Sequence, residues 1–134
     1  MSVRTKKPKG PTLKAAFEVE FERREAERRE REEAERRQQE QDLASAEALY
    51  AAVTADPEFL AKRDLVADRR RYTVSLDHKN FRIAAYFEAG QASVTLSDKR
   101  SATTGTAAPR KQEAAEGLED ALRIMAGFLA DEAR

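Results

Sequence analysis

The sequence predicts an α+β fold: a long N-terminal charged helix, then a small domain of helix, three-stranded antiparallel meander and C-terminal helix. Two observations predict this class. From Thr12 to about Val53 the chain has neither proline nor glycine and consists mostly of residues that favour helix. Between residues 72 and 97, apolar and polar residues alternate in three short segments, which is the pattern of strands with one buried face.

The composition allows one small domain and an extension. The chain has 134 residues, 40% of them hydrophobic and 37% charged, and the charged excess is concentrated early in the sequence. The formal net charge is zero. Basic residues dominate 1–14 and 69–112, whereas acidic residues dominate 15–68 and 113–134. This alternation suits pairing within the chain or between subunits as well as it suits an acidic partner.

The sequence excludes several classes of chemistry. It has no cysteine, which rules out disulfides, thiolate nucleophiles and cysteine-bound zinc. A single histidine, together with carboxylates interspersed among arginines, predicts no metal site and no cofactor. No apolar run approaches the roughly 18 residues of a membrane helix, and no hydrophobic segment follows the basic N-terminus. We therefore expect a cytoplasmic protein that does not bind a membrane.

The first predicted segments are a disordered basic tail at 1–11 and a long charged helix at 12–42. Thr12 is positioned to cap this helix at its N-terminus. Glutamate–arginine pairs four residues apart recur along the segment, and each adds about 0.2–0.5 kcal/mol to helix stability. A heptad stepped through the segment places arginine, glutamate and glutamine at its seam. We therefore predict a stiff, solvated helix rather than a tight coiled coil.

One face at the start of this helix is apolar. Leu13, Phe17 and Phe21 are spaced by four residues, so they lie on the same side of a helix. Burying each of these side chains contributes about 1.5–3 kcal/mol, so something should cover them. We predict that these three residues bind the partner. A partner's groove, a second copy of the chain and the chain's own domain all remain possible occupants.

Residues 43–134 are predicted to form a compact domain, which starts with the end of the long helix. An apolar stripe at helical spacing continues to Val53. Asp56 is then a strong candidate for the N-cap of another helix, because Pro57 suits the first helical position. We predict a second short helix over about 57–67.

Three strands are predicted next, at 72–76, 81–87 and 92–97. The connections between them, at 77–80 and 88–91, are short and rich in turn residues. One face of these strands is apolar and the other is rich in hydroxyl side chains, which predicts an antiparallel meander with one buried face. If strand 92–97 is an unprotected edge, it offers a second route to pairing.

The last predicted element is a helix from Pro109 to about residue 132, which follows a loop at 98–109. Proline suits the first turn of a helix, because its missing N–H would be unpaired there in any case. The apolar residues of this segment recur at helical spacing, so they form the natural cover of the sheet. They are Ala114, Leu118, Ala121, Leu122, Met125, Phe128 and Leu129.

No catalytic residue is predicted. His78 is the only histidine and stands in a polar turn beside Asp77. A catalytic triad would need this histidine together with a buried and oriented serine, whereas a histidine in an exposed hairpin turn is simply solvated. We therefore expect no enzymatic activity.

Basic residues cluster around the predicted sheet. The order helix–strand–strand–strand–helix, with His78 in the first hairpin turn and Arg110 opening the last helix, resembles the double-stranded-RNA-binding domain. This resemblance implies that the hairpin turn enters the RNA minor groove and that the last helix contacts the backbone. The candidate nucleic-acid-binding residues are Arg69, Arg70, Arg71, His78, Lys79, Lys99, Arg100, Arg110 and Lys111. The alternative is that these side chains pair with the acidic helices.

Together these patterns predict a non-enzymatic interaction protein, acting in scaffolding or as a regulatory adaptor. It would dock through the N-terminal apolar anchor, carried on a stiff charged helix, onto a protein partner or a second copy of itself. The alternative is a small nucleic-acid-binding protein that uses the basic sheet and loop region.

Overall fold

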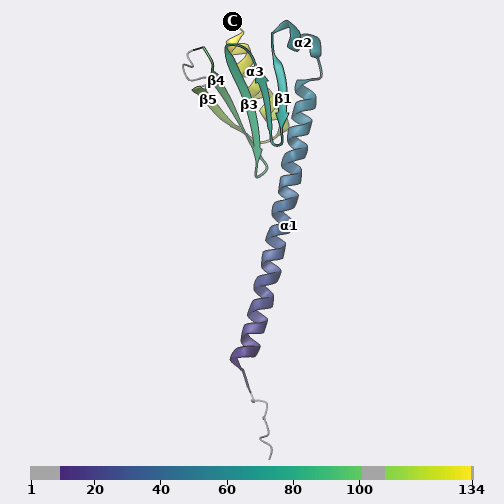
Figure 1. Cartoon of the computed structure of the whole chain (residues 1–134), viewed down its shortest axis with the longest axis vertical. Coiled ribbons are helices and arrows are strands. Elements are labelled where there is room, and N and C mark those ends of the chain that lie inside the picture. The colour runs from purple at the N-terminus through teal and green to yellow at the C-terminus, as the bar shows by residue number, and fades with distance from the viewer. Residues whose placement is uncertain (1–9, 101–107, 134) are drawn as a thin grey trace, which may run out of the picture. The chain divides into compact units, whose positions relative to one another are not determined.

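The computed structural model of the chain describes residues 10–100 and 108–133 (Figure 1). It confirms the α+β class, the long N-terminal helix and the C-terminal helix, but the antiparallel sheet has five strands rather than three. Most of the predicted tail and most of the loop predicted at 98–109 lie outside the described residues. The elements are α1 (Leu13–Val53), α2 (Pro57–Lys62), β1 (Val66–Arg70), β2 (Thr73–Asp77), β3 (Phe81–Glu88), β4 (Gln91–Asp98), β5 (Ala108–Ala115) and α3 (Leu118–Glu132).

The chain divides into two compact units, residues 1–36 and residues 37–134. The first unit contributes most of α1 to the described structure. The second unit contains the last turns of α1 together with α2, α3 and the whole sheet. Each unit is therefore described separately below.

Helix α1 begins and ends close to where the sequence predicts. Thr12 is its N-cap, since the Ala15 amide donates to Thr12 Oγ1 at 3.1 Å. The side chains from residue 13 to residue 37 are almost all exposed, and ion pairs connect many of them. Among the described residues, no helix combines the length and the apolar run that crossing a bilayer requires.

Ion pairs connect many side chains of α1, but they follow the predicted four-residue spacing from glutamate to arginine only in part. Glu20 pairs with Arg24 at the predicted spacing and also accepts from Arg23, three residues away. Arg28 bridges the carboxylates of Glu25 and Glu32, which lie on either side of it along the helix. Along α1, three ion pairs join residues three apart and four join residues four apart, because both spacings put side chains on neighbouring turns.

These ion pairs make the stability of α1 depend on pH. Side-chain hydrogen bonds, from Arg23 and then Arg24, lower the pKa of Glu20, and a hydrogen bond from Arg28 lowers that of Glu25. A carboxyl group whose pKa is lower in the helix than in the unfolded chain stabilises the helix above its ordinary pKa. This contribution is lost as the pH falls through the lowered value.

We therefore expect the variant Glu20→Gln/Glu25→Gln to be less helical than the wild type at neutral pH. The difference should vanish as the pH falls well below about 4, the ordinary pKa range of glutamate. Far-ultraviolet circular dichroism across a pH series measures this. A difference that persists unchanged in acid would show that propensity, and not ion pairing, separates the two proteins.

Helix α2 begins as predicted but ends early. Asp56 is the N-cap, accepting from the Phe59 amide at 3.1 Å, and Pro57 occupies the first helical position. The predicted extension to about residue 67 is wrong, because Asp64 adopts a left-handed conformation with φ of 57°. Such a residue commonly ends a helix, and aspartate tolerates it better than most residues do. The chain then turns into β1.

The sheet is a meander in which each strand pairs with its neighbours in the chain, in the order β1-β2-β3-β4-β5. The three predicted strands correspond to β2, β3 and β4. Their apolar residues share one face, as the register places Leu76 opposite Ile83 and Ala85 opposite Val94. The suggestion that strand 92–97 is a free edge is wrong, because β4 lies between β3 and β5.

Strand β5 occupies residues that the sequence predicts to be the start of the last helix. Residues 108–115 pair with β4 across a bulge between Leu96 and Ser97, so α3 begins only at Leu118. Pairing with β4 overrides the helix preference of this alanine-, lysine- and glutamate-containing segment. Pro109 is compatible with this position, because an edge strand does not need every backbone N–H for the ladder.

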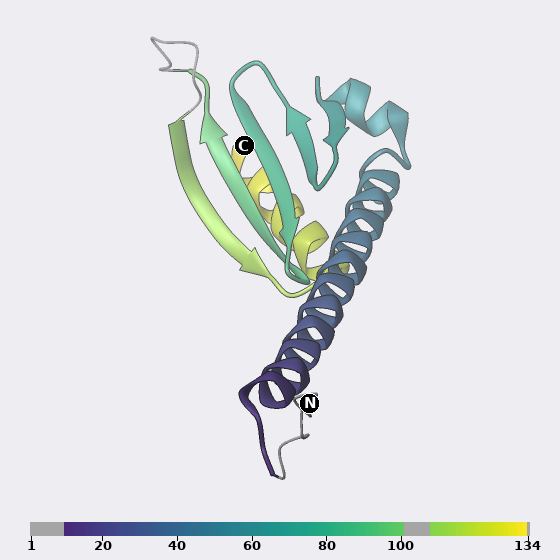
Figure 2. The same cartoon turned by 60° about the horizontal axis from the view of Figure 1, so that its bottom comes forward.

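The core of the second unit lies between the apolar face of the sheet and the helices. In both views α3 lies along one side of the sheet (Figure 1 and Figure 2). It buries Ile124, Met125 and Phe128 there, while the end of α1 buries Ala46 and Leu49. On the opposite face, Arg82, Tyr86 and Glu88 of β3 are exposed and Ala84 is half-buried.

A buried carboxylate ties α1 to the sheet within the second unit. Asp42 accepts hydrogen bonds from the backbone amides of Ala89 and Gly90 at 3.0 and 2.9 Å, and from the Gln38 side chain at 3.1 Å. Ala89 and Gly90 both have positive φ, of 52° and 80°, as a two-residue type I′ turn requires. Asp42 thus caps the turn between β3 and β4.

Candidate functional site

The first candidate is the anchor face, which we define as Leu13, Phe17 and Phe21 at the start of α1. Their exposed fractions are 87%, 59% and 52%. The rings of Phe17 and Phe21 stack with their centroids 5.5 Å apart and 29° between planes. The result is one continuous apolar strip, because residues four apart lie on neighbouring turns of one face. A strip of this kind on a helix is suited to insertion into an apolar groove.

Charged side chains border the anchor face. Lys14 and Glu18 form a loose pair at 3.9 Å, and Glu20 is engaged by Arg23 and Arg24. These neighbours keep the helix solvated around the apolar strip without covering it. Val19 is also exposed, but its position in the helical repeat places it away from the strip.

The second candidate, the basic set predicted to bind nucleic acid, is largely engaged by acidic side chains. Lys99 lies 2.9 Å from Asp77, and Lys111 lies 3.1 Å from Asp131. Glu132 on α3 forms ion pairs with Arg110 on β5 and with Arg100, which follows β4. Six of the nine residues form ion pairs of this kind, namely Arg69, Arg70, Lys99, Arg100, Arg110 and Lys111.

The three other members of the basic set do not gather at one place. Arg71 lies in the turn between β1 and β2, whereas His78 and Lys79 lie in the turn between β2 and β3. Antiparallel pairing puts these turns at opposite ends of β2. Within the described ranges, none of the three forms an ion pair. The observed positions therefore match the pairing alternative better than a single basic surface.

Asp98 shows how closely the charges are matched at the end of β4. The backbone amide and then the side chain of Arg100 donate to its carboxylate and lower its pKa. Arg110, 3.9 Å away, lowers it further. Both arginines also reach Glu132, so these cations are held in a local network and are less available to phosphates.

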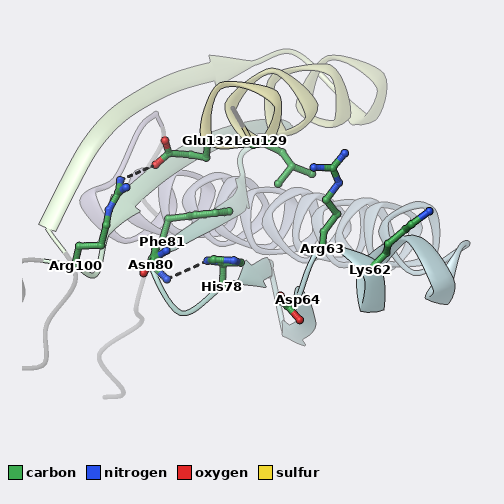
Figure 3. Close-up of a pocket in the computed structure, with 10 residues that line it drawn as sticks. Lys62, Arg63, Asp64, His78, Asn80, Phe81, Arg100, Leu129 and Glu132 are labelled. Atoms are coloured by element: carbon green, nitrogen blue, oxygen red, sulfur yellow. Dashed lines mark hydrogen bonds and ion pairs between the residues drawn. The ribbon is translucent and has the colours of Figure 1, made fainter.

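A polar pocket of about 250 Å³ lies beside His78, between the end of α2, the turn after β2 and the end of α3 (Figure 3). Contrary to the prediction of a simply solvated side chain, His78 is half-buried. Its ring stacks on Phe81 with centroids 4.6 Å apart, and its Nδ1 accepts from the Asn80 amide at 3.1 Å. Among the described residues that line the pocket there is no serine, threonine or tyrosine, so none of these residues gives His78 a hydroxyl nucleophile to activate.

Sequence reasoning missed an apolar groove on the second unit. We call it the α2–α3 groove and define it by Val53, Phe59, Leu60, Leu122, Met125 and Leu129; its volume is about 200 Å³. Phe59 and Leu122 remain 43% and 38% exposed within it. A hollow of about 220 Å³ adjoins it, shares Phe59 and Leu129, and is bordered by Arg63.

Metal binding finds little support in the described part of the chain. No group of three or more histidine, aspartate or glutamate side chains is arranged to hold an ion there.

Comparison of the chain with protein families, curated proteins and solved structures finds no match. The surfaces described above are therefore the features of the molecule that bear on its function.

Proposed function

We propose that this protein is a non-enzymatic interaction protein, a scaffold or regulatory adaptor, that binds a protein partner through the anchor face. One observation carries the proposal: two stacked phenylalanines and a leucine are more than half exposed on one side of α1. Their burial in a partner is worth about 1.5–3 kcal/mol for each side chain. Clustered aromatic anchors of this kind provide much of the binding energy in protein interfaces.

The charged part of α1 supports this role. A helix this poor in apolar residues has no apolar core to stabilise it. Its successive ion pairs provide part of the stability that side-chain packing provides in other helices. The anchor face is thereby presented on a preformed helix. Preforming the helix reduces the entropy lost when the segment enters a groove.

The ion pairs of the basic residues favour a protein partner over nucleic acid. Binding to nucleic acid depends on cations that neutralise phosphates and release counterions. Six of the nine candidate cations already contact carboxylates, which a nucleic acid would have to displace. The two additional strands also depart from the three-stranded order on which the RNA-binding resemblance depends.

A photo-crosslinking amino acid at position 17 tests the anchor face in the cells that produce the protein. We expect irradiation to give one or a few discrete adducts, which identify what covers Phe17. Position 19 is the matched control, because Val19 is 69% exposed on the same segment but away from the strip. The same adducts from both positions, or none from position 17, would remove the proposal.

A further inference from the structure

We infer that strand β5 pairs with the β5 strand of a second copy of this chain, antiparallel and centred on Gln112, so that two five-stranded sheets join into one. This pairing concerns the second unit alone and is independent of the anchor face. It goes beyond the proposed function, because it assigns a partner to a different surface.

One edge of β5 has no partner among the described strands. The order of the sheet ends at β5, which pairs with β4, and both views show β5 as the outermost strand on its side of the sheet (Figure 1 and Figure 2). The side chains from residue 109 to residue 114 are all exposed. An edge strand leaves the N–H and C=O groups of its outer side unpaired, and the addition of another strand satisfies them.

The charges of β5 are complementary to themselves. They are opposite on either side of Gln112, since Lys111 precedes it and Glu113 follows it. Their partners on β4 are Leu96 and Val94, which are both buried, so the two charged side chains lie on the face of the sheet that α3 covers. A two-fold axis at Gln112 sets the lysine of each copy opposite the glutamate of the other. Opposite charges directly across an antiparallel pair stabilise it.

The same charges disfavour the neighbouring registers. A two-fold pair centred on Lys111 would set two lysines against each other, and one centred on Glu113 would set two glutamates against each other. Like charges directly opposite destabilise a strand pair. A slip by a single residue would instead bring together side chains from opposite faces of the sheet. The charges that reject unmatched strands at this edge therefore select one partner, a second copy in a single register.

Lys111 can accommodate a second carboxylate. Its ammonium group lies 3.1 Å from Asp131 on α3, but the side chain is still 43% exposed. An ammonium group has three donors, so it can bind two carboxylates at once. Glu113 forms no ion pair with another described residue. In the pair of chains, Lys111 gains the glutamate of the second copy without losing the ion pair within its own chain.

The joined edge is short. Pro109 lacks a backbone N–H, so we expect the new ladder to be confined to residues 110–114. Pairing over this length buries less surface than the roughly 1,200 Å² at which stable interfaces begin, and smaller interfaces are typical of transient complexes. We therefore expect a reversible dimer that forms as the concentration rises.

Sedimentation velocity of the full chain, over a concentration series that reaches the millimolar range, tests the pairing. We expect the wild type to shift from the mass of one 15.1-kDa chain towards that of two. Glu113→Lys should raise the dissociation constant about tenfold or more, because both ion pairs become like-charge contacts. Glu88→Lys makes the same change at an exposed position on β3 and should associate like the wild type. A wild type that keeps the mass of one chain throughout would overturn the pairing.

Exchanging the two charges gives a sharper test. The variant Lys111→Glu/Glu113→Lys keeps opposite charges around Gln112, so it should associate more tightly than Glu113→Lys. A mixture of Lys111→Glu chains with Glu113→Lys chains should contain a dimer that neither forms alone, because every glutamate then faces a lysine. Thermal unfolding verifies that each variant is folded. If the exchanged variant were as weak as Glu113→Lys, or if the mixture did not associate, the register centred on Gln112 would be wrong.

Hydrogen exchange locates the contact and separates it from the proposed function. The amides of residues 110–114 should exchange more slowly as the concentration of the wild type rises, and Phe17→Ser/Phe21→Ser should associate like the wild type. Loss of association in that variant, with unchanged exchange in β5, would overturn the strand pairing and leave the anchor face as the binding surface. Normal association without any specific crosslink at position 17 would overturn the proposed function and leave the strand pairing.

Discussion

Replacing Leu49 by alanine is expected to reduce the free energy of unfolding by about 3 kcal/mol. Leu49 is the largest fully buried side chain on α1 and belongs to the core cluster that includes Val74, Ile83 and Leu96. Truncation removes the transfer free energy of its side chain and leaves a cavity, because the surrounding sheet and helices relax only in part. Urea denaturation followed by circular dichroism measures the change.

The same substitution at Leu13 is the matched control. Both residues are leucines on one helix, but Leu13 is exposed and Leu49 is not. Leu13→Ala should therefore alter the free energy of unfolding by no more than about 0.5 kcal/mol, as is usual for surface positions. Equal losses at the two positions would contradict the arrangement in which only the end of α1 belongs to the core.

Replacing Asp42 by alanine is expected to cost about 2 kcal/mol. Its carboxylate accepts from two backbone amides and from one side-chain amide, and all three donors lose a charged acceptor together. The two backbone donors lie in a tight turn with positive φ, so they cannot easily find other partners within the fold. The midpoint of urea denaturation should fall while the slope of the transition stays constant.

Two further variants identify the carboxylate as the cause. Asp42→Asn retains a single acceptor oxygen, so it should lose only part of the stability that Asp42→Ala loses. Glu40→Ala removes an exposed acidic residue from the same stretch of α1 and should have little effect. If the alanine variants at 40 and 42 were equally stable, the cap on the β3–β4 turn would contribute nothing measurable.

The elements that the sequence predicts well are those whose local pattern agrees with their final environment. Helix α1 has favourable residues throughout and the Thr12 cap, so little tertiary information is needed to define it. Strands β3 and β4 alternate because each has one face on the core and one face that is more exposed, whereas in β2 Ser75 is buried as well as its apolar neighbours. The alternation of apolar and polar residues in the sequence therefore reflects which side chains are buried in the fold.

The two edge strands, β1 and β5, could not be predicted because their sequences lack the alternation of apolar and polar residues that marks a strand packed on a core. Strand β1 contains an aspartate and two arginines in five residues, and β5 contains helix-favouring residues after a proline. Charged residues and proline on edge strands prevent unwanted pairing between molecules, so they remove the alternation that identifies interior strands. Only the pairing with β2 and β4 reveals them.

The candidate sites also differ in how far the sequence predicts them. The anchor face could be predicted, because three residues on one helix create it and their spacing alone places them together. The α2–α3 groove could not, since it requires Val53, Phe59 and Leu122 to meet from three separate helices. Likewise, the basic residues are visible in the sequence, but their acidic partners on β2, β4 and α3 become apparent only in the fold.

The sequential order of the five strands bears on how the protein acquires its structure. The first four strands are joined by connections of two or three residues, so pairing them costs little chain entropy and can proceed hairpin by hairpin. Contacts of greater sequence separation, such as the hydrogen bond from the Gly90 amide to Asp42, join α1 to the sheet. We therefore expect the sheet to assemble before the end of α1 and α3 dock onto it.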